Sequence, residues 1–134
     1  MNNTRLNITV IVIFILSFTG SYVIHGKLLV ADYATLPIYR AVGEIKLPWI
    51  VLGHLCLAIG AAWIYAKGVE PKLWLGQGLR FGLALWLVVS VPSFFISYAV
   101  LRDETLFLMI KQSAYELVNK LVLGLVAAAI YRKA

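Results

Sequence analysis

The chain has 134 residues, of which 62% are hydrophobic and 13% are charged. A soluble domain carries about 45–50% apolar and about 25% charged residues, so this composition excludes an ordinary water-soluble domain. The length suits one compact unit, and we expect residues 1–134 to form a single integral membrane domain. The net charge of +6 does not indicate a nucleic-acid partner, because the basic residues flank apolar segments and form no cluster on a soluble surface.

Four apolar segments are long enough to cross the hydrocarbon core as helices, which takes about 20 residues each. They cover residues 6–24, 47–66, 73–101 and 106–130. No cleavage motif follows the first segment, so we expect an uncleaved first span and not a signal peptide. The second and third loops are short, which favours antiparallel neighbours. The sequence therefore predicts an all-α, four-transmembrane-helix bundle with up-down-up-down topology.

Two features modify this simple plan. The first loop is long and mixes apolar and charged residues, and Pro37 and Gly43 should prevent a single helix there. We expect the first span to continue a turn or two beyond the interface, with Tyr39 and Arg40 lying along the outer surface. Within the third span, Pro92 should kink the helix or free a backbone carbonyl.

The basic residues predict the orientation of the chain. Four lie on the side of the first loop: Lys27, Arg40, Lys46 and Arg102. Six lie on the other side: Arg5, Lys67, Lys72, Arg80, Arg132 and Lys133. Because basic residues are enriched in cytoplasmic loops, this asymmetry predicts that both termini are cytoplasmic.

The last span contains a polar stripe that should not face lipid. Gln112, Glu116, Asn119 and Leu123 recur at i, i+4, i+7 and i+11, so they share one helical face. Lys120 follows Glu116 by four residues, a spacing that allows an ion pair within the helix. A charge at bilayer depth costs at least a few kcal/mol, so it normally faces a partner or a water-filled cavity.

Two interpretations of this stripe remain open at the sequence level. In the first, it lines a hydrated pocket between the second, third and fourth spans that is reached from outside and binds a ligand. In the second, a Glu116–Arg80–Lys120 network only fixes the register of the helices, with Arg80 reaching across from the third span.

The two histidines allow a weaker alternative, a haem or redox site with His25 and His54 as ligands. A hydrogen bond from His54 to Gln112 is a more economical prediction, and we expect no metal and no cofactor. The lone Cys56 excludes an intrachain disulfide and a cysteine-based metal site. The sequence contains no nucleophile elbow, phosphate-binding loop or zinc-protease motif, so we expect no enzymatic activity. The recurring Gly76, Gly78 and Gly82 are better explained by close helix packing.

Three segments of the chain are distinctive: PWIVLGHLCLAIGAAWIYAKG, WLGQGLRFGLALW and DYATLPIYR. In these segments the chain resembles a group of small four-span bacterial membrane proteins without an assigned activity, and the resemblance covers about residues 22–131. It implies the bacterial inner (cytoplasmic) membrane and a four-span fold, and it assigns no residue a role.

The leading functional prediction is an integral membrane protein that binds a lipid or small amphipathic ligand in a polar-lined intramembrane cavity. Transport is an extension of this hypothesis that would require a homo-oligomer to complete a path. The main alternative is an accessory or assembly subunit of a larger membrane complex. The candidate ligand-binding residues are Gln112, Glu116, Asn119, Lys120, Arg80 and His54.

Overall fold

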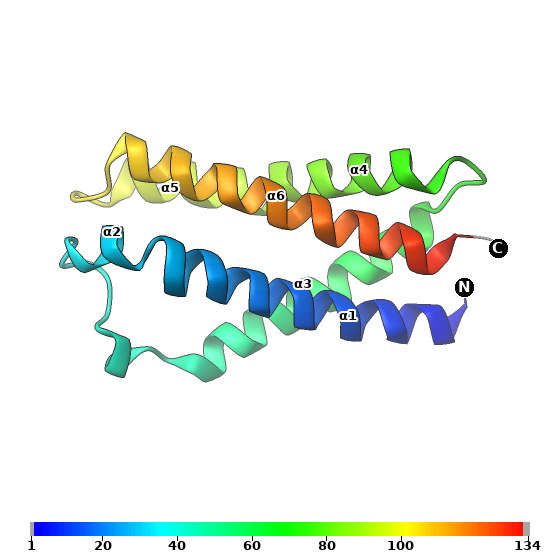
Figure 1. Ribbon diagram of the computed structural model, residues 1–134, viewed down its shortest axis with the longest axis horizontal. Coiled ribbons are helices and arrows are strands. Elements are labelled where there is room, and N and C mark those ends of the chain that lie inside the picture. Colours follow the sequence, from blue (N-terminus) through cyan, green and yellow to red (C-terminus); the bar gives the residue numbers. More distant parts are fainter. Residues whose placement is uncertain (1, 133–134) are drawn as a thin grey trace.

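The computed structural model describes residues 2–132 and confirms an all-α bundle of four long helices with up-down-up-down topology (Figure 1). The first membrane helix is α1 (Asn3–Val23) with a π-helical turn (Ile24–Leu28), and the second is α3 (Leu47–Gly68). The third consists of α4 (Trp74–Leu85), a π-helical turn (Trp86–Ser90) and α5 (Val91–Val100), and the fourth is α6 (Leu106–Tyr131). All four are long and apolar enough to span a membrane. Lys133, counted in the charge asymmetry, lies outside the described residues.

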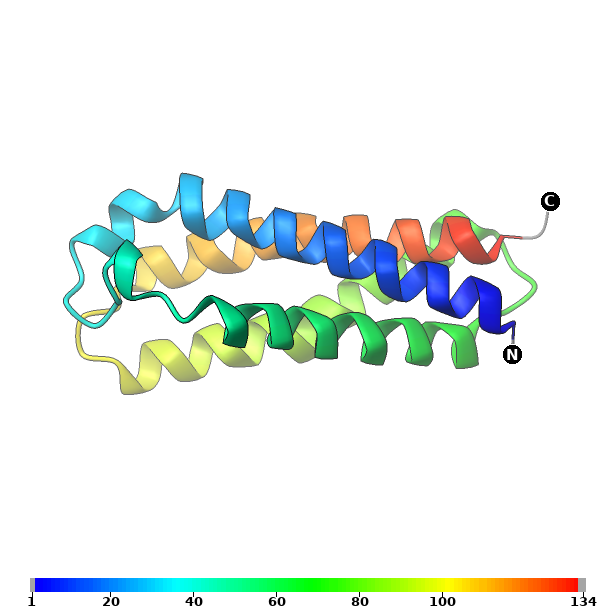
Figure 2. The same cartoon turned by 90° about the horizontal axis from the view of Figure 1, so that it is seen from below.

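The start of α1 and the end of α6 lie at one end of the bundle, which we call the terminal end (Figure 1). The first loop and the α5–α6 loop lie at the opposite end, which we call the distal end (Figure 2). Local signals set where two helices begin. The Asn2 side chain accepts a hydrogen bond from the Arg5 N–H, and the Thr105 hydroxyl accepts one from the Leu108 N–H. Both residues cap backbone donors that have no partner within the helix.

The first span continues beyond α1, as expected from the sequence. Its π-helical turn is followed by the short helix α2 (Val30–Ala34), and a 3₁₀ turn (Val42–Glu44) then leads to α3. Pro37 lies in the non-helical segment between them, in agreement with its role as a helix breaker. Because the chain turns here, α2 lies near the distal ends of α1 and α6, where Tyr33 contacts His25 and Asp32 contacts Lys111.

A π-helical turn also precedes Pro92 in the third membrane helix. Proline lacks an N–H and cannot complete the α-helical hydrogen-bond pattern, so a local change of helical geometry is expected at this point. In the structure the Val91 N–H donates to the Trp86 carbonyl, one residue further back than in an α-helix. The Trp86 indole N–H donates to the Ser113 carbonyl at 2.8 Å and thereby ties this irregular segment to α6.

Helix α6 is the centre of the bundle, because it packs against α1 on one side and most tightly against α4 on the other. The contact with α4 is made by glycines. A Cβ atom added to Gly82 would lie 2.6 Å from the Lys120 carbonyl oxygen, and one added to Gly78 would lie 2.9 Å from that of Gly124. The predicted close packing is therefore confirmed for Gly78 and Gly82, which have the spacing of a small-xxx-small contact. Gly76 has open space around it and takes no part.

Helix α3 is less enclosed than the others. It packs mainly against α1 and makes few contacts with α6, and it does not pack closely against α4 or α5. The apolar core accordingly lies among α1, α3, α4 and α6 toward the terminal end, and its buried members are Ile13, Ala58, Ala61, Ala62, Tyr65, Leu85, Leu123, Ala127, Ala128 and Tyr131. The seam between α3 and the α4–α5 helix is left open in two places.

Candidate functional site

The polar stripe predicted on the last span is buried within the bundle. Gln112, Glu116 and Lys120 are 3%, 5% and 5% exposed, and they follow one another at intervals of four residues on α6. The Lys120 ammonium and the Glu116 carboxylate form an ion pair within the helix, as the spacing predicted. The Asn119 amide donates to the same carboxylate at 3.4 Å and packs against Gly20 of α1. Two polar side chains of α6, Asn119 and Lys120, thus bond to Glu116, and Gln112 lies one turn further along the same face.

His25 and Tyr33 complete this cluster from the distal end. The π-helical turn after α1 places the His25 ring between Glu116 and Tyr33, with its Nε2 3.3 Å from Glu116 Oε1 and its Nδ1 2.5 Å from the Tyr33 hydroxyl oxygen. The Gln112 amide donates to that hydroxyl oxygen at 3.0 Å. The consistent assignment is a chain in which Gln112 donates to Tyr33, Tyr33 donates to His25, and His25 donates to Glu116.

The Glu116–Lys120 ion pair lines a groove between α3 and α5. The groove has a volume of about 340 Å³, and Glu116 and Lys120 form its polar floor. Its walls are Ile50, Gly53, His54 and Leu57 from α3, and Val89, Ser90, Ser93 and Phe94 from the third membrane helix. The groove is lined by residues of the second, third and fourth spans. The hydrated, ligand-binding pocket predicted between these spans, reached from outside, stays a prediction.

A second set of interacting polar side chains lies beside the Glu116 cluster, toward the distal end of the bundle. Lys111 donates to Asp32 of α2 at 2.8 Å, and the rings of Tyr33 and Tyr39 are 4.4 Å apart between centroids. Burial raises the pKa of Tyr33 above its ordinary value, and the hydrogen bond from Gln112 opposes this shift. The first loop therefore forms a hydrogen-bonded cover over the Glu116 cluster.

Glu104, in the α5–α6 loop, is 6% exposed, and neither of its carboxyl oxygens has a hydrogen-bond partner among residues 2–132. Burial in this position raises the pKa of its carboxyl group. The physical cause is that a buried carboxylate without a partner is costly, so ionisation is opposed at this position.

We expect Glu104→Gln to raise the melting temperature of the purified protein at neutral pH. The pKa of Glu104 is higher in the folded chain than in the unfolded one, so folding binds a proton. The contribution to stability is then largest below the ordinary pKa of 4.5 and is lost as the pH rises toward the raised value. Thermal unfolding across this range should show a smaller decline with pH for the variant. A lower melting temperature for Glu104→Gln at neutral pH would instead indicate an ionised carboxylate with a partner.

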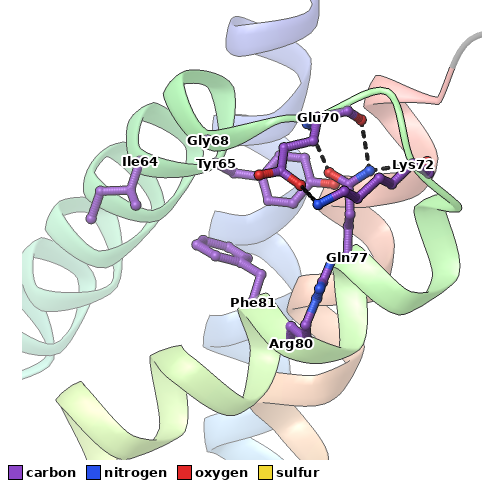
Figure 3. A pocket seen from close by; sticks show the side chains of 8 residues that line it. All are labelled: Ile64, Tyr65, Gly68, Glu70, Lys72, Gln77, Arg80 and Phe81. Carbon is purple, nitrogen blue, oxygen red and sulfur yellow. Dashed lines mark hydrogen bonds and ion pairs between the residues drawn. The ribbon is translucent and has the colours of Figure 1, made fainter.

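Two side-chain contacts predicted from the sequence are wrong. Arg80 does not join the Glu116 network: it is exposed and lines a different pocket, together with Glu70 and Lys72 at the terminal end (Figure 3). The reason is the helical period, because Arg80 follows Gly78 by two residues, and residues two apart point to opposite sides of a helix. Gly78 faces α6, so Arg80 points away from it.

His54 does not bond to Gln112. Its Nδ1 lies 3.1 Å from the Ser17 hydroxyl oxygen, because α3 packs against α1 at this depth. The two histidines also make a poor pair of haem ligands, since both ring nitrogens of His25 already have protein partners. Within the part of the chain that the structure describes, no three His, Cys, Asp or Glu residues are grouped as metal ligands would be.

Three polar residues at the distal end were not predicted from the sequence. Tyr33 joins the Glu116 cluster, Asp32 pairs with Lys111, and Glu104 is buried in the α5–α6 loop. All three lie outside the spans, where polar residues are ordinary and give no signal. From the sequence, His25 is predicted only as a haem or redox ligand. A histidine at the end of one span can equally form a hydrogen bond to a glutamate on a neighbouring span, as His25 does with Glu116.

The fold and the buried polar cluster together define a four-span integral membrane protein. No protein-family model, curated protein or solved structure matches the chain. The resemblance to small bacterial four-span proteins therefore stays a prediction, except for the four spans themselves.

Proposed function

We propose that the protein binds a lipid or another small amphipathic molecule in the groove between α3 and α5. The observation that carries this proposal is that a buried Glu116–Lys120 ion pair forms the floor of a groove whose walls are otherwise largely apolar. Such a groove suits a ligand with a polar end and an apolar body, because the polar end finds charged and hydroxyl partners while the body contacts side chains such as Leu57 and Phe94.

The roles of the lining residues follow from their positions. Lys120 offers an ammonium donor and Glu116 a carboxylate acceptor at the floor, and Ser90 and Ser93 offer hydroxyl groups from the opposite wall. His54 lines the groove while its Nδ1 is engaged by Ser17, so its Nε2 is the ring nitrogen available to a ligand. The proposed activity is binding without catalysis, and a transport role would require a second copy of the chain to complete a path.

A glycine variant tests the groove without touching its charges. A Cβ added to Gly53, in the groove wall, meets nothing within 4 Å, so Gly53→Leu should fill part of the groove without disturbing helix packing. Gly60 is the matched control, since it lies in the same helix, also has open space and does not line the groove.

We expect native mass spectrometry of the wild type and of Gly60→Leu to show a retained lipid or small molecule. Gly53→Leu should lose it. Equal retention by all three proteins would contradict binding in this groove.

A second candidate function is an accessory subunit of a larger membrane complex. The observation in its favour is that Gly53 and Gly60 lie seven residues apart on one face of α3, both with open space, on a helix that is packed on only one side. A helix of another protein could approach closely at such a face. In that case a stoichiometric membrane partner should co-purify with the wild type, and both leucine variants should lose it.

The proposed location is a bacterial inner membrane with both termini in the cytoplasm. The support for this orientation is the excess of basic residues at the terminal end of the bundle. A reporter fused after Ala134 should be active only in its cytoplasmic form, and one inserted near Leu36 only in its periplasmic form. The reverse pattern would overturn the orientation and leave the four spans unchanged.

A further inference from the structure

A second pocket, with a volume of about 330 Å³, lies at the terminal end of the bundle (Figure 3). It is formed where α3 ends and α4 begins, and it is lined by Ile64, Tyr65, Gly68, Glu70, Lys72, Gln77, Arg80 and Phe81. It shares no residue with the groove above the ion pair. Its polar members come from the α3–α4 loop and from one face of α4, and its apolar members come from α3 and α4.

The loop that forms this pocket is held in place by a buried glutamine. Gln77 is 8% exposed, and its amide oxygen accepts a hydrogen bond from the Glu70 N–H at 3.0 Å. Its amide nitrogen donates to the Glu70 carbonyl at 2.7 Å and to the Lys72 carbonyl at 3.0 Å. Three bonds to the backbone fix the positions from which Glu70 and Lys72 extend (Figure 3).

The pocket carries an excess positive charge. Lys72 Nζ lies 2.6 Å from Glu70 Oε2, and this pairing lowers the pKa of Glu70, with a smaller contribution from nearby Arg80. Arg80 itself has no carboxylate within 4 Å among residues 2–132. One carboxylate therefore faces two cations, which leaves the pocket with a net charge of one positive unit.

The position of Arg80 along the membrane helix places this charge near the lipid phosphates. The helix Trp74–Val100 has 27 residues and is about 40 Å long, longer than the roughly 30 Å of the hydrocarbon core. The first turn of α4 then lies in the headgroup layer. Arg80 begins about 9 Å from Trp74 along the axis, and its long side chain can extend back to that layer. A guanidinium at this boundary lies at the depth of the lipid phosphates, which attract basic side chains.

We propose that this pocket binds the phosphate group of an anionic phospholipid. Arg80 and Lys72 contact the phosphate oxygens, the Tyr65 hydroxyl is a further donor, and the acyl chains lie against Ile64 and Phe81. Arginine suits this role because its planar guanidinium can form two parallel hydrogen bonds to a phosphate. The inference does not depend on the function proposed for the groove, since none of these residues lines it.

The test is the retention of lipid by the purified full chain. The protein is released for native mass spectrometry from nanodiscs that contain phosphatidylglycerol and phosphatidylcholine in equal amounts. We expect the wild type to retain phosphatidylglycerol in preference, and Arg80→Gln to reduce that preference about tenfold. Arg80→Lys should restore it only in part, because lysine cannot form the paired bonds. Lys67→Gln is the control, since Lys67 carries the same charge at the same end and does not line the pocket.

Three outcomes would overturn the proposal. Arg80→Gln could keep the wild-type preference, or Lys67→Gln could lose as much as Arg80→Gln, which would indicate an unspecific effect of surface charge. Inorganic phosphate in excess could displace the retained lipid completely, which would indicate a site for free phosphate. Because Arg80 is exposed, its substitution should not unfold the chain, and Lys72→Gln provides a second variant with the same expected direction.

Discussion

Replacing Gly82 by alanine should destabilise the bundle by about 1–3 kcal/mol, and replacing it by leucine should cost more than that. A Cβ atom at this position would lie 2.6 Å from the Lys120 carbonyl oxygen and 2.7 Å from the Leu121 Cα. Both atoms belong to the backbone of α6, so no side chain can move aside. The two helices must separate, and the dispersion contacts along their shared face weaken together.

Gly76→Ala is the matched control for this prediction. It lies in the same helix, and a Cβ there meets nothing within 4 Å, so the substitution should be neutral or slightly stabilising through its helix propensity. Unfolding in a mixed detergent series, followed by circular dichroism, would measure both variants. Equal effects of the two alanines would show that α4 and α6 are not in close contact at Gly82.

The course of the spans could be predicted from the sequence because lipid leaves few solutions. A backbone in hydrocarbon must satisfy its own hydrogen bonds, so apolar runs of about 20 residues become helices whatever their neighbours. The ends of α3 and α6 accordingly agree with the apolar segments to within two residues. The same argument predicted that the face of Gln112, Glu116, Asn119 and Leu123 would turn away from lipid, and the structure buries all of these residues except Asn119, which is half-buried.

The partners of that face could not be predicted in the same way, because they depend on which helices become neighbours. The positions of the residues along their spans predict Arg80 as the partner of Glu116, and Gln112 as the partner of His54. The glycine contact with α6 turns Arg80 away, and the packing of α3 on α1 gives His54 a partner in Ser17. The contribution of Tyr33 depends on the fold of a loop that has no hydrophobic periodicity to read.

Replacing Glu116 by alanine should destabilise the protein by roughly 3–5 kcal/mol, because it leaves a buried cation without its partner. Lys120 is 5% exposed and is paired with Glu116, and the same carboxylate accepts from His25 and Asn119. The loss therefore includes the ion pair and the link between α6 and the distal end of α1. It can be measured by unfolding in the same detergent series.

A double-mutant cycle separates the pair from its surroundings. Glu116→Leu together with Lys120→Leu removes both charges and should recover much of the loss, because no unpaired ion then remains in the bundle. Glu116→Leu with Arg80→Leu is the control cycle. Since Arg80 lies in the other pocket, its effect should add to that of Glu116 with no coupling. Coupling between Glu116 and Arg80 would contradict the placement of Arg80 described above.

The size of the Glu116→Ala effect also reports on the groove. In a dry bundle the ammonium of Lys120 has no substitute for the carboxylate, and the full cost appears. Lys120 lines the groove, so water or the polar end of a ligand could reach it there. A loss below about 1 kcal/mol would contradict the dry pair and show that the groove solvates the cation. Adding Gly53→Leu to Glu116→Ala should then restore the larger cost, because the leucine side chain extends into the space from which the solvating groups act.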